Sequence, residues 1–143
     1  MALLEQLQAD ATTALKAGDR ERAGALRLCV SELQKAVKEG GADEVEVLTR
    51  ERKRRLESAQ AYRDAGREDL ANTEDAEAEM IASYLPEQIS DEELHALVGD
   101  AVAESGASSP KEMGKVMSLV MPKVKGRADG KRVSSAVQEK LTA

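Results

Sequence analysis

Apolar residues recur along this chain at the three- and four-residue spacing of a helix, and glycines or capping residues interrupt the pattern at short intervals. No stretch shows the apolar and polar alternation that is typical of a β-strand. The only aromatic residues are Tyr62 and Tyr84, so the core has to consist of Leu, Val, Ile, Met and Ala, which suits helices better than sheets. The sequence therefore predicts an all-α fold.

Start and stop signals divide the pattern into seven expected helices. Asp19, Asp43 and Ser90 are N-cap residue types, and glycines at 18, 40, 41, 66 and 106 stand where helices are expected to end. The apolar faces expected for these helices are Leu4, Leu7, Ala11, Ala14, Leu15; Ala23, Leu26, Val30, Leu33, Val37; Val45, Leu48, Leu56, Ala59, Tyr62; Leu70, Met80, Ile81, Tyr84; Leu94, Leu97, Val98, Ala101, Val102; Met113, Val116, Met117, Val120, Met121; and Val133, Val137, Leu141.

Pro86 marks the expected boundary between two parts of the chain. Proline disfavours helical geometry at the preceding residue, so the fourth helix is expected to end near Tyr84. We expect residues 1–86 to form an N-terminal four-helix bundle and residues 87–143 to form a small three-helix tail domain with antiparallel neighbours. In the tail, an N-cap followed by proline predicts a helix that begins at Pro110.

The sequence predicts a cytoplasmic protein that does not enter a membrane. No apolar run reaches the roughly 18 residues that span a bilayer, and the N-terminus lacks the basic region of a signal peptide. The single cysteine, Cys29, has no second cysteine for an internal disulfide and is expected to be a small buried residue in a helix.

Charge is segregated along the chain, although the formal net charge is only -6. Seven basic and three acidic residues lie between residues 50 and 67, whereas residues 68–110 contain twelve acidic residues and no Lys or Arg. The basic patch of the third helix consists of Arg50, Arg52, Lys53, Arg54 and Arg55. Two interpretations fit this patch: a surface that binds nucleic acid, or a solvated helix face in which Glu51 and Arg55 form an i, i+4 ion pair.

A second concentration of positive charge surrounds the glycine turn that follows the Met-rich helix of the tail. It consists of Lys123, Lys125, Arg127, Lys131 and Arg132. Cations and free backbone amides at such a turn together favour an anion, so these five residues are the candidate nucleic-acid site. A structural role is the alternative, with Asp129 capping the last helix and Gly126 and Gly130 permitting the turn. We also expect the fold to tolerate reversal of Arg127, as of any exposed cation.

The sequence has no motif of a hydrolase, kinase or metalloprotease. His95 lacks a nearby nucleophile, and the acidic group Glu74, Asp75, Glu77 and Glu79 is expected to be a solvated face. The three methionines Met113, Met117 and Met121 are expected in the core, with an adaptable docking groove as the alternative. We therefore expect no catalytic residues, no metal and no cofactor.

Short motifs in both parts of the chain resemble the GatB/YqeY family, which includes stand-alone YqeY proteins and the C-terminal tail of the GatB subunit of glutamine-dependent tRNA amidotransferase. The residues that carry this resemblance are MGKVM at 113–117, KGRADG at 125–130, YLP at 84–86, LRL at 26–28, ES at 57–58 and GR at 66–67. In length, the chain is similar to the stand-alone type.

The resemblance implies a tRNA-associated module, because the GatB tail contacts the tRNA body in the amidotransferase. Two alternatives remain: a protein-interaction module with a partner in tRNA aminoacylation or amidation, and a carbon–nitrogen ligase with glutamine as amido donor. In the family, the catalytic steps belong to other parts of the amidotransferase, so we expect the chain alone to be inactive.

Overall fold

The computed structural model describes residues 2–41 and 43–143, and in this part of the chain it contains seven α-helices, one short 3-10 helix and no strand. The elements are α1 (Ala2–Lys16), α2 (Arg20–Lys38), α3 (Glu44–Asp64), α4 (Glu68–Ala82), α5 (Asp91–Ser105), η1 (Pro110–Glu112), α6 (Met113–Val124) and α7 (Gly130–Thr142). The predicted all-α class is confirmed.

The helices gather into two compact units, Met1–Leu85 and Pro86–Ala143. The expectation that 1–86 and 87–143 are separate domains stays a prediction, because it concerns whether each part folds independently.

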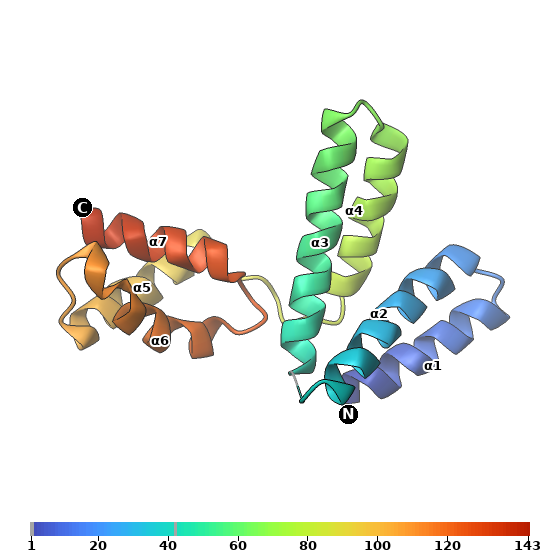
Figure 1. The fold of residues 1–143 in the computed structure, drawn as a ribbon, viewed down its shortest axis with the longest axis horizontal. Helices are drawn as coiled ribbons and strands as arrows, with labels where there is room; N and C mark the ends of the chain where they lie inside the picture. The colour runs from blue at the N-terminus through green and yellow to red at the C-terminus, as the bar shows by residue number, and fades with distance from the viewer. Residues whose placement is uncertain (1, 42) are drawn as a thin grey trace. The chain divides into compact units, whose positions relative to one another are not determined.

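The first unit consists of two antiparallel hairpins, α1–α2 and α3–α4, which lie side by side within each pair in Figure 1. One shared core joins them: Leu7, Leu26 and Leu33 of the first hairpin pack with Leu48 and Ile81 of the second. Away from this core the axes of the two hairpins diverge (Figure 1). The four-helix unit is thus built from two helix pairs.

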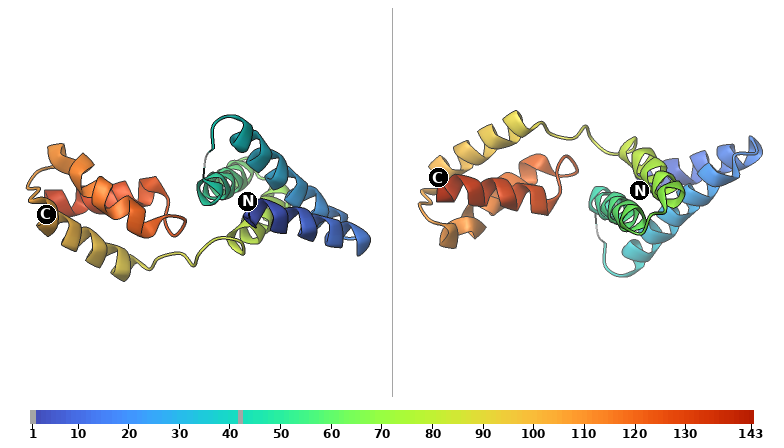
Figure 2. Two further views of the ribbon diagram at one scale, coloured as in Figure 1. Left: turned by 90° about the horizontal axis from the view of Figure 1, so that it is seen from below. Right: turned by 90° about the horizontal axis from the view of Figure 1, so that it is seen from above.

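The second unit packs α5, α6 and α7 around a core of valines, and its three helices can be followed in both views of Figure 2. Val116, Val120 and Val124 of α6 are fully buried at i, i+4 spacing. The three methionines of α6 are only partly buried and pack against the edge of this core. Methionine is therefore peripheral in this core, while the β-branched valines fill its centre.

Helix boundaries follow the predicted signals closely. The side chains of Asp19, Asp43 and Ser90 accept hydrogen bonds from first-turn amides, as N-caps do. Two ends differ from the prediction. The helix α4 ends at Ala82, and Tyr84 follows in a turn from which its hydroxyl donates to Asp10 Oδ2 at 2.5 Å. The segment that begins at Pro110 is a 3-10 turn, and the α-helix starts only at Met113.

Three residues expected on apolar faces are exposed, namely Leu15, Val37 and Leu56. Conversely, the carboxylate Glu51 is buried, with 5% of its surface exposed. Leu15 and Val37 lie near the ends of their helices and outside the shared core, which their neighbours Ala14 and Ala36 contact. In the described residues, no helix combines the length and apolar character required to cross a bilayer.

The two glycines that flank the tail turn should respond differently to substitution. Gly126 has a φ of +75°, whereas Gly130 does not have a positive φ and a Cβ there would meet nothing within 4 Å. We expect Gly126→Ala to destabilise the protein by about 1–2 kcal/mol because an L-residue is strained in the left-handed region. Gly130→Ala should stabilise it by roughly 0.4–1 kcal/mol by restricting the unfolded chain. Urea unfolding of both variants measures this difference, and equal effects would contradict it.

Candidate nucleic-acid interface

The tail turn, residues 125–129, is fixed at both ends by the core of the second unit. Val124 and Val133 are fully buried on either side of it, and Ala128 in its middle is buried as well. Asp129 accepts a hydrogen bond from the Arg132 amide at 2.8 Å and is the N-cap of α7. The predicted capping role of Asp129 is confirmed. Gly126 supplies the left-handed residue, but Gly130 is simply the first residue of α7.

Arg127 joins this turn to the segment that leads into α5. Its Nη1 and Nη2 donate to the two carboxylate oxygens of Glu93 at 3.2 and 3.0 Å, and its Nε donates to the Glu87 carbonyl at 3.0 Å. In addition, the Ile89 amide donates to the Arg127 carbonyl at 2.9 Å, and Gln88 Nε2 donates to the Gly126 carbonyl at 3.1 Å. This set of contacts, which we call the Arg127 clasp, holds the turn against residues 87–93.

The clasp changes the expectation for Arg127. Its hydrogen bonds to Glu93 raise the pKa of Arg127 and lower the pKa of the Glu93 carboxyl, so both groups are charged and paired. A phosphate that contacts this guanidinium has to displace a bidentate carboxylate. Arg127 therefore has a structural role in holding the turn. That it contacts phosphate stays a prediction.

Arg132 also has a carboxylate partner, but in a more exposed setting. Its Nη2 donates to Asp91 Oδ1 at 2.6 Å, while the Asp91 side chain is 82% exposed. The hydrogen bond to Arg132 lowers the pKa of Asp91. Because exposed ion pairs contribute little net stability, a phosphate could replace Asp91 here at small cost.

The three lysines of the candidate site, Lys123, Lys125 and Lys131, are all exposed. Within residues 2–41 and 43–143, Lys123 and Lys131 form no ion pair. The amides of Arg127 and Ala128 donate to the Val124 carbonyl, so the turn itself offers few free donors. In the described chain, the first-turn amides of Gly130 and Lys131 have no backbone partner. Open amide donors and the cation of Lys131 therefore lie together at the start of α7, while Lys123 lies in the last turn of α6.

The basic patch of α3 is divided between surface and interior. Arg50 and Lys53 are exposed, whereas Arg52 is half-buried. Arg55 is only 20% exposed and approaches Glu51 at 3.7 Å, which confirms the predicted i, i+4 pair.

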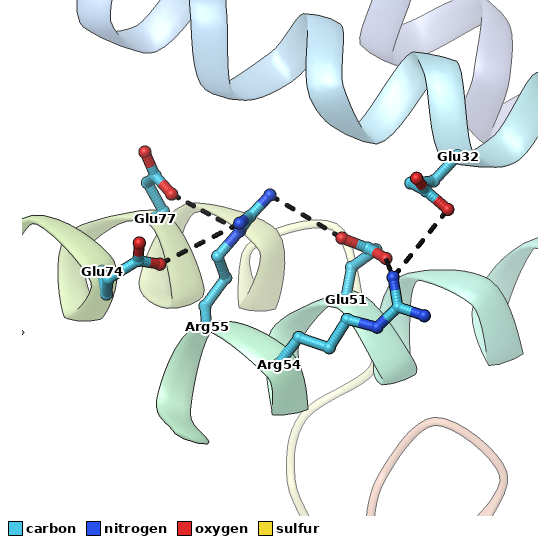
Figure 3. Close-up of polar contacts among 6 residues, drawn as sticks. All are labelled: Glu32, Glu51, Arg54, Arg55, Glu74 and Glu77. Carbon is cyan, nitrogen blue, oxygen red and sulfur yellow. Dashed lines mark hydrogen bonds and ion pairs between the residues drawn. The ribbon is translucent and has the colours of Figure 1, made fainter. Parts of the chain in front are cut away.

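Arg55 also bridges to the neighbouring helix, through Glu77 at 3.4 Å and Glu74 at 4.0 Å on α4 (Figure 3). Arg54 donates to Glu51 at 2.9 Å and lies 4.0 Å from Glu32 on α2. Arg54 and Arg55 thus connect three helices, which is a structural role.

Of the four acidic residues of α4 that were predicted to form a solvated face, Glu79 is exposed, but the other three are partly buried in ion pairs. Glu74 and Glu77 face Arg55, and Arg63 of α3 pairs with Asp75 and with Glu68. The signal that could have revealed this is the glycine turn at 66, since a basic and an acidic helix joined by a tight turn must lie antiparallel and face each other.

Cys29 is buried, as the sequence predicted. It lies close to this group of charges. Burial, together with the nearby Glu51 carboxylate, raises the pKa of the thiol to about 11. A thiol of this kind is protonated and unreactive at neutral pH.

A family model described as Yqey-like protein matches residues 4–141. A fungal protein named "Altered inheritance of mitochondria protein 41, mitochondrial", from Pyrenophora tritici-repentis (strain Pt-1C-BFP), is 28% identical over 149 residues; the match covers 99% of this chain and 82% of the fungal protein.

The Arg127 clasp predicts that reversal of Arg127 destabilises the second unit. Arg127→Glu places a carboxylate against Glu93 and removes three hydrogen bonds, so we expect a lower midpoint of thermal unfolding. The charge swap Arg127→Glu with Glu93→Arg should restore part of the loss. Lys123→Glu is the control, because Lys123 is exposed outside the clasp, and it should leave the midpoint unchanged.

Acid unfolding gives a second readout of the same pair. Because the folded-state pKa of Glu93 is lowered, its contribution to stability is present above the ordinary Glu pKa and is lost as pH falls through the lowered value. Glu93→Gln should therefore flatten the fall in stability over the acidic range. An identical acid profile for the variant and the natural sequence would refute the clasp.

Cys29 should resist thiol reagents in the folded protein. With a pKa of about 11, it is thiolate in roughly a thousandth of molecules at about pH 8, and it is also shielded by packing. We expect labelling by a chromogenic disulfide reagent to be slow in buffer and fast in denaturing urea. Rapid labelling in buffer would show that the core of the first unit opens readily.

Proposed function

The chain belongs to the Yqey-like protein family, and on that premise we propose that it is a non-catalytic module that binds tRNA through the basic turn of its second unit. The motifs MGKVM and KGRADG, which resemble the tail of GatB, both lie in this unit, and KGRADG contains the turn itself. The observation that carries the proposal is the set of exposed cations beside the open first-turn amides of α7.

The proposal gives different tasks to the five candidate residues. Lys123, Lys125 and Lys131 contact phosphates directly, as exposed ammonium groups do. Arg132 exchanges Asp91 for a phosphate, since both are anionic acceptors for the same guanidinium. Arg127 remains paired with Glu93 and holds the turn in the conformation that presents the other four cations. Such contacts position an RNA backbone without reading its sequence.

A non-catalytic role agrees with the placement of the reactive side chains. Cys29 is buried in the first unit with a raised pKa, and His95 is exposed on α5 of the second unit. In residues 2–41 and 43–143, neither side chain forms a hydrogen bond or an ion pair that would activate a nucleophile. The alternatives are a protein-interaction module and a carbon–nitrogen ligase with glutamine as amido donor, and ammonia release from glutamine by the purified chain would support the second.

We also propose that the protein acts in the cytoplasm. The name of the fungal relative assigns that protein to mitochondria. Under this proposal, this chain and the fungal protein act in different compartments. Cell fractionation of the source organism tests this proposal.

Titration with bulk tRNA at several salt concentrations tests the main proposal. Four phosphate contacts predict that log K falls with log salt at a slope of about -3. The double reversal Lys123→Glu and Lys131→Glu should weaken binding to all tRNAs alike and reduce the slope by about 1.5.

The matched control is Arg50→Glu with Lys53→Glu, because these two cations are exposed on α3 and lie outside its ion pairs with α4. Arg54 and Arg55 do not serve as controls, since their reversal would disturb the packing of three helices. If the tail reversal has no effect while the α3 reversal abolishes binding, the site lies on α3. If tRNA does not bind even at low salt, the protein-interaction role replaces this proposal.

A further inference from the structure

A groove in the first unit has no part in the proposed tRNA site. It occupies about 420 Å³ between the beginning of α2 and the middle of α4. This volume lies within the roughly 300–1,000 Å³ typical of ligand sites. The groove exists because the two hairpins diverge from their shared core, and because Ala25 and Ala76 are too small to fill the space between the helices.

The groove has an apolar floor and an acidic rim. Ala25, Ala76 and Met80 supply the apolar surface, and Asp19, Glu21 and Glu77 supply the carboxylates. Arg22 is the one cation among the lining residues. Its guanidinium lies within hydrogen-bond reach of the Tyr84 hydroxyl, which in turn donates to Asp10. The charge of Arg22 is therefore already directed at these oxygen atoms.

Glu77 connects the groove to the ion pairs between α3 and α4. One of its oxygens lies 3.4 Å from Arg55 Nε, and the other points away from Arg55 in Figure 3. The group in Figure 3 contains four carboxylates but only two guanidinium groups, so negative charge is in excess. Burial raises the pKa of Glu77, Arg55 partly opposes this, and the like charge of Glu74 raises the pKa further. A second cation near Glu77 would offset the repulsion from Glu74.

We propose that this groove binds a short basic helical segment of a partner protein, with one Arg or Lys side chain against Glu77 and its aliphatic stem over Ala76 and Met80. The carboxylate rim complements a cation, and the floor complements the apolar stem of such a side chain. From residue 72 to residue 80 the groove follows α4 for about 12 Å, which is roughly two turns of a helix. The excess of carboxylates repels a polyanion, so this partner is a protein rather than RNA.

The test uses the full chain and a synthetic amphipathic helix as the probe. The probe is a capped peptide of about 12 residues made of Arg, Leu and Ala, and its counterpart carries Glu in place of every Arg. Titration followed by amide chemical shifts should show the Arg peptide perturbing the amides of Ala25, Thr73 and Ala76. The Glu peptide should leave these signals unmoved.

Two pairs of variants locate the contact. Ala76→Trp fills the groove and should weaken the Arg peptide about tenfold or more, which corresponds to about 1.4 kcal/mol. Ala61→Trp, at an exposed position of α3 outside the groove, is its control. Glu77→Gln should weaken binding several-fold, whereas Glu79→Gln, an exposed carboxylate outside the groove, should not.

Three results would overturn the proposal. These are equal binding of the Arg and Glu peptides, undiminished binding to Ala76→Trp, and no binding of the Arg peptide up to roughly 1 mM. Self-association of the full chain that Ala76→Trp abolishes would also overturn it, because the occupant would then be a second copy. None of these results depends on whether the tail binds tRNA.

Discussion

The pairing of the buried Glu51 carboxylate with Arg55 is the interaction on which the first unit depends. Glu51 is 5% exposed, and the two arginines that neutralise it also reach Glu32 on α2 and two glutamates on α4. Removing one partner of such a buried pair typically costs about 3–5 kcal/mol, because a charge is left uncompensated. That is a large part of the roughly 5–15 kcal/mol that stabilises a whole domain. Arg54 and Arg55 are therefore occupied in stabilising the fold, and a ligand would have to compete with their glutamate partners.

The helical class and most helix ends could be predicted from the sequence because they depend on local signals. Capping by Asp19, Asp43 and Ser90 is decided within three residues of the chain, and glycine turns are equally local. Burial was harder to predict because it depends on which helix lies opposite. Leu56 has the periodicity of a core residue but is exposed. Glu51 is buried beside Arg54 and Arg55 of its own helix, and these arginines also reach glutamates on α2 and α4.

In the candidate site too, some features depend on local signals and others on contacts between distant residues. Clustering of cations around the tail turn follows directly from the sequence, and so does the N-cap at Asp129. What could not be predicted is that Arg127 meets Glu93, 34 residues earlier in the chain, since no local signal pairs them. The charges of α3 and α4 differ in this respect, because a basic helix and the acidic helix that follows it become neighbours in one hairpin. Charge counted along the chain therefore overstates the field that a partner meets.

The contacts of residues 87–89 with the tail turn also fix where the second unit begins along the chain. Leu85 packs on the first core, whereas the Glu87 carbonyl, the Gln88 side chain and the Ile89 amide are all bonded to the turn. Only Pro86 lies between these two sets of contacts, and its ring fixes its own φ. Residues 87–93 are therefore held to the second unit by the turn itself. The shape that the turn presents to a ligand depends on this segment, which lies more than 30 residues earlier in the sequence.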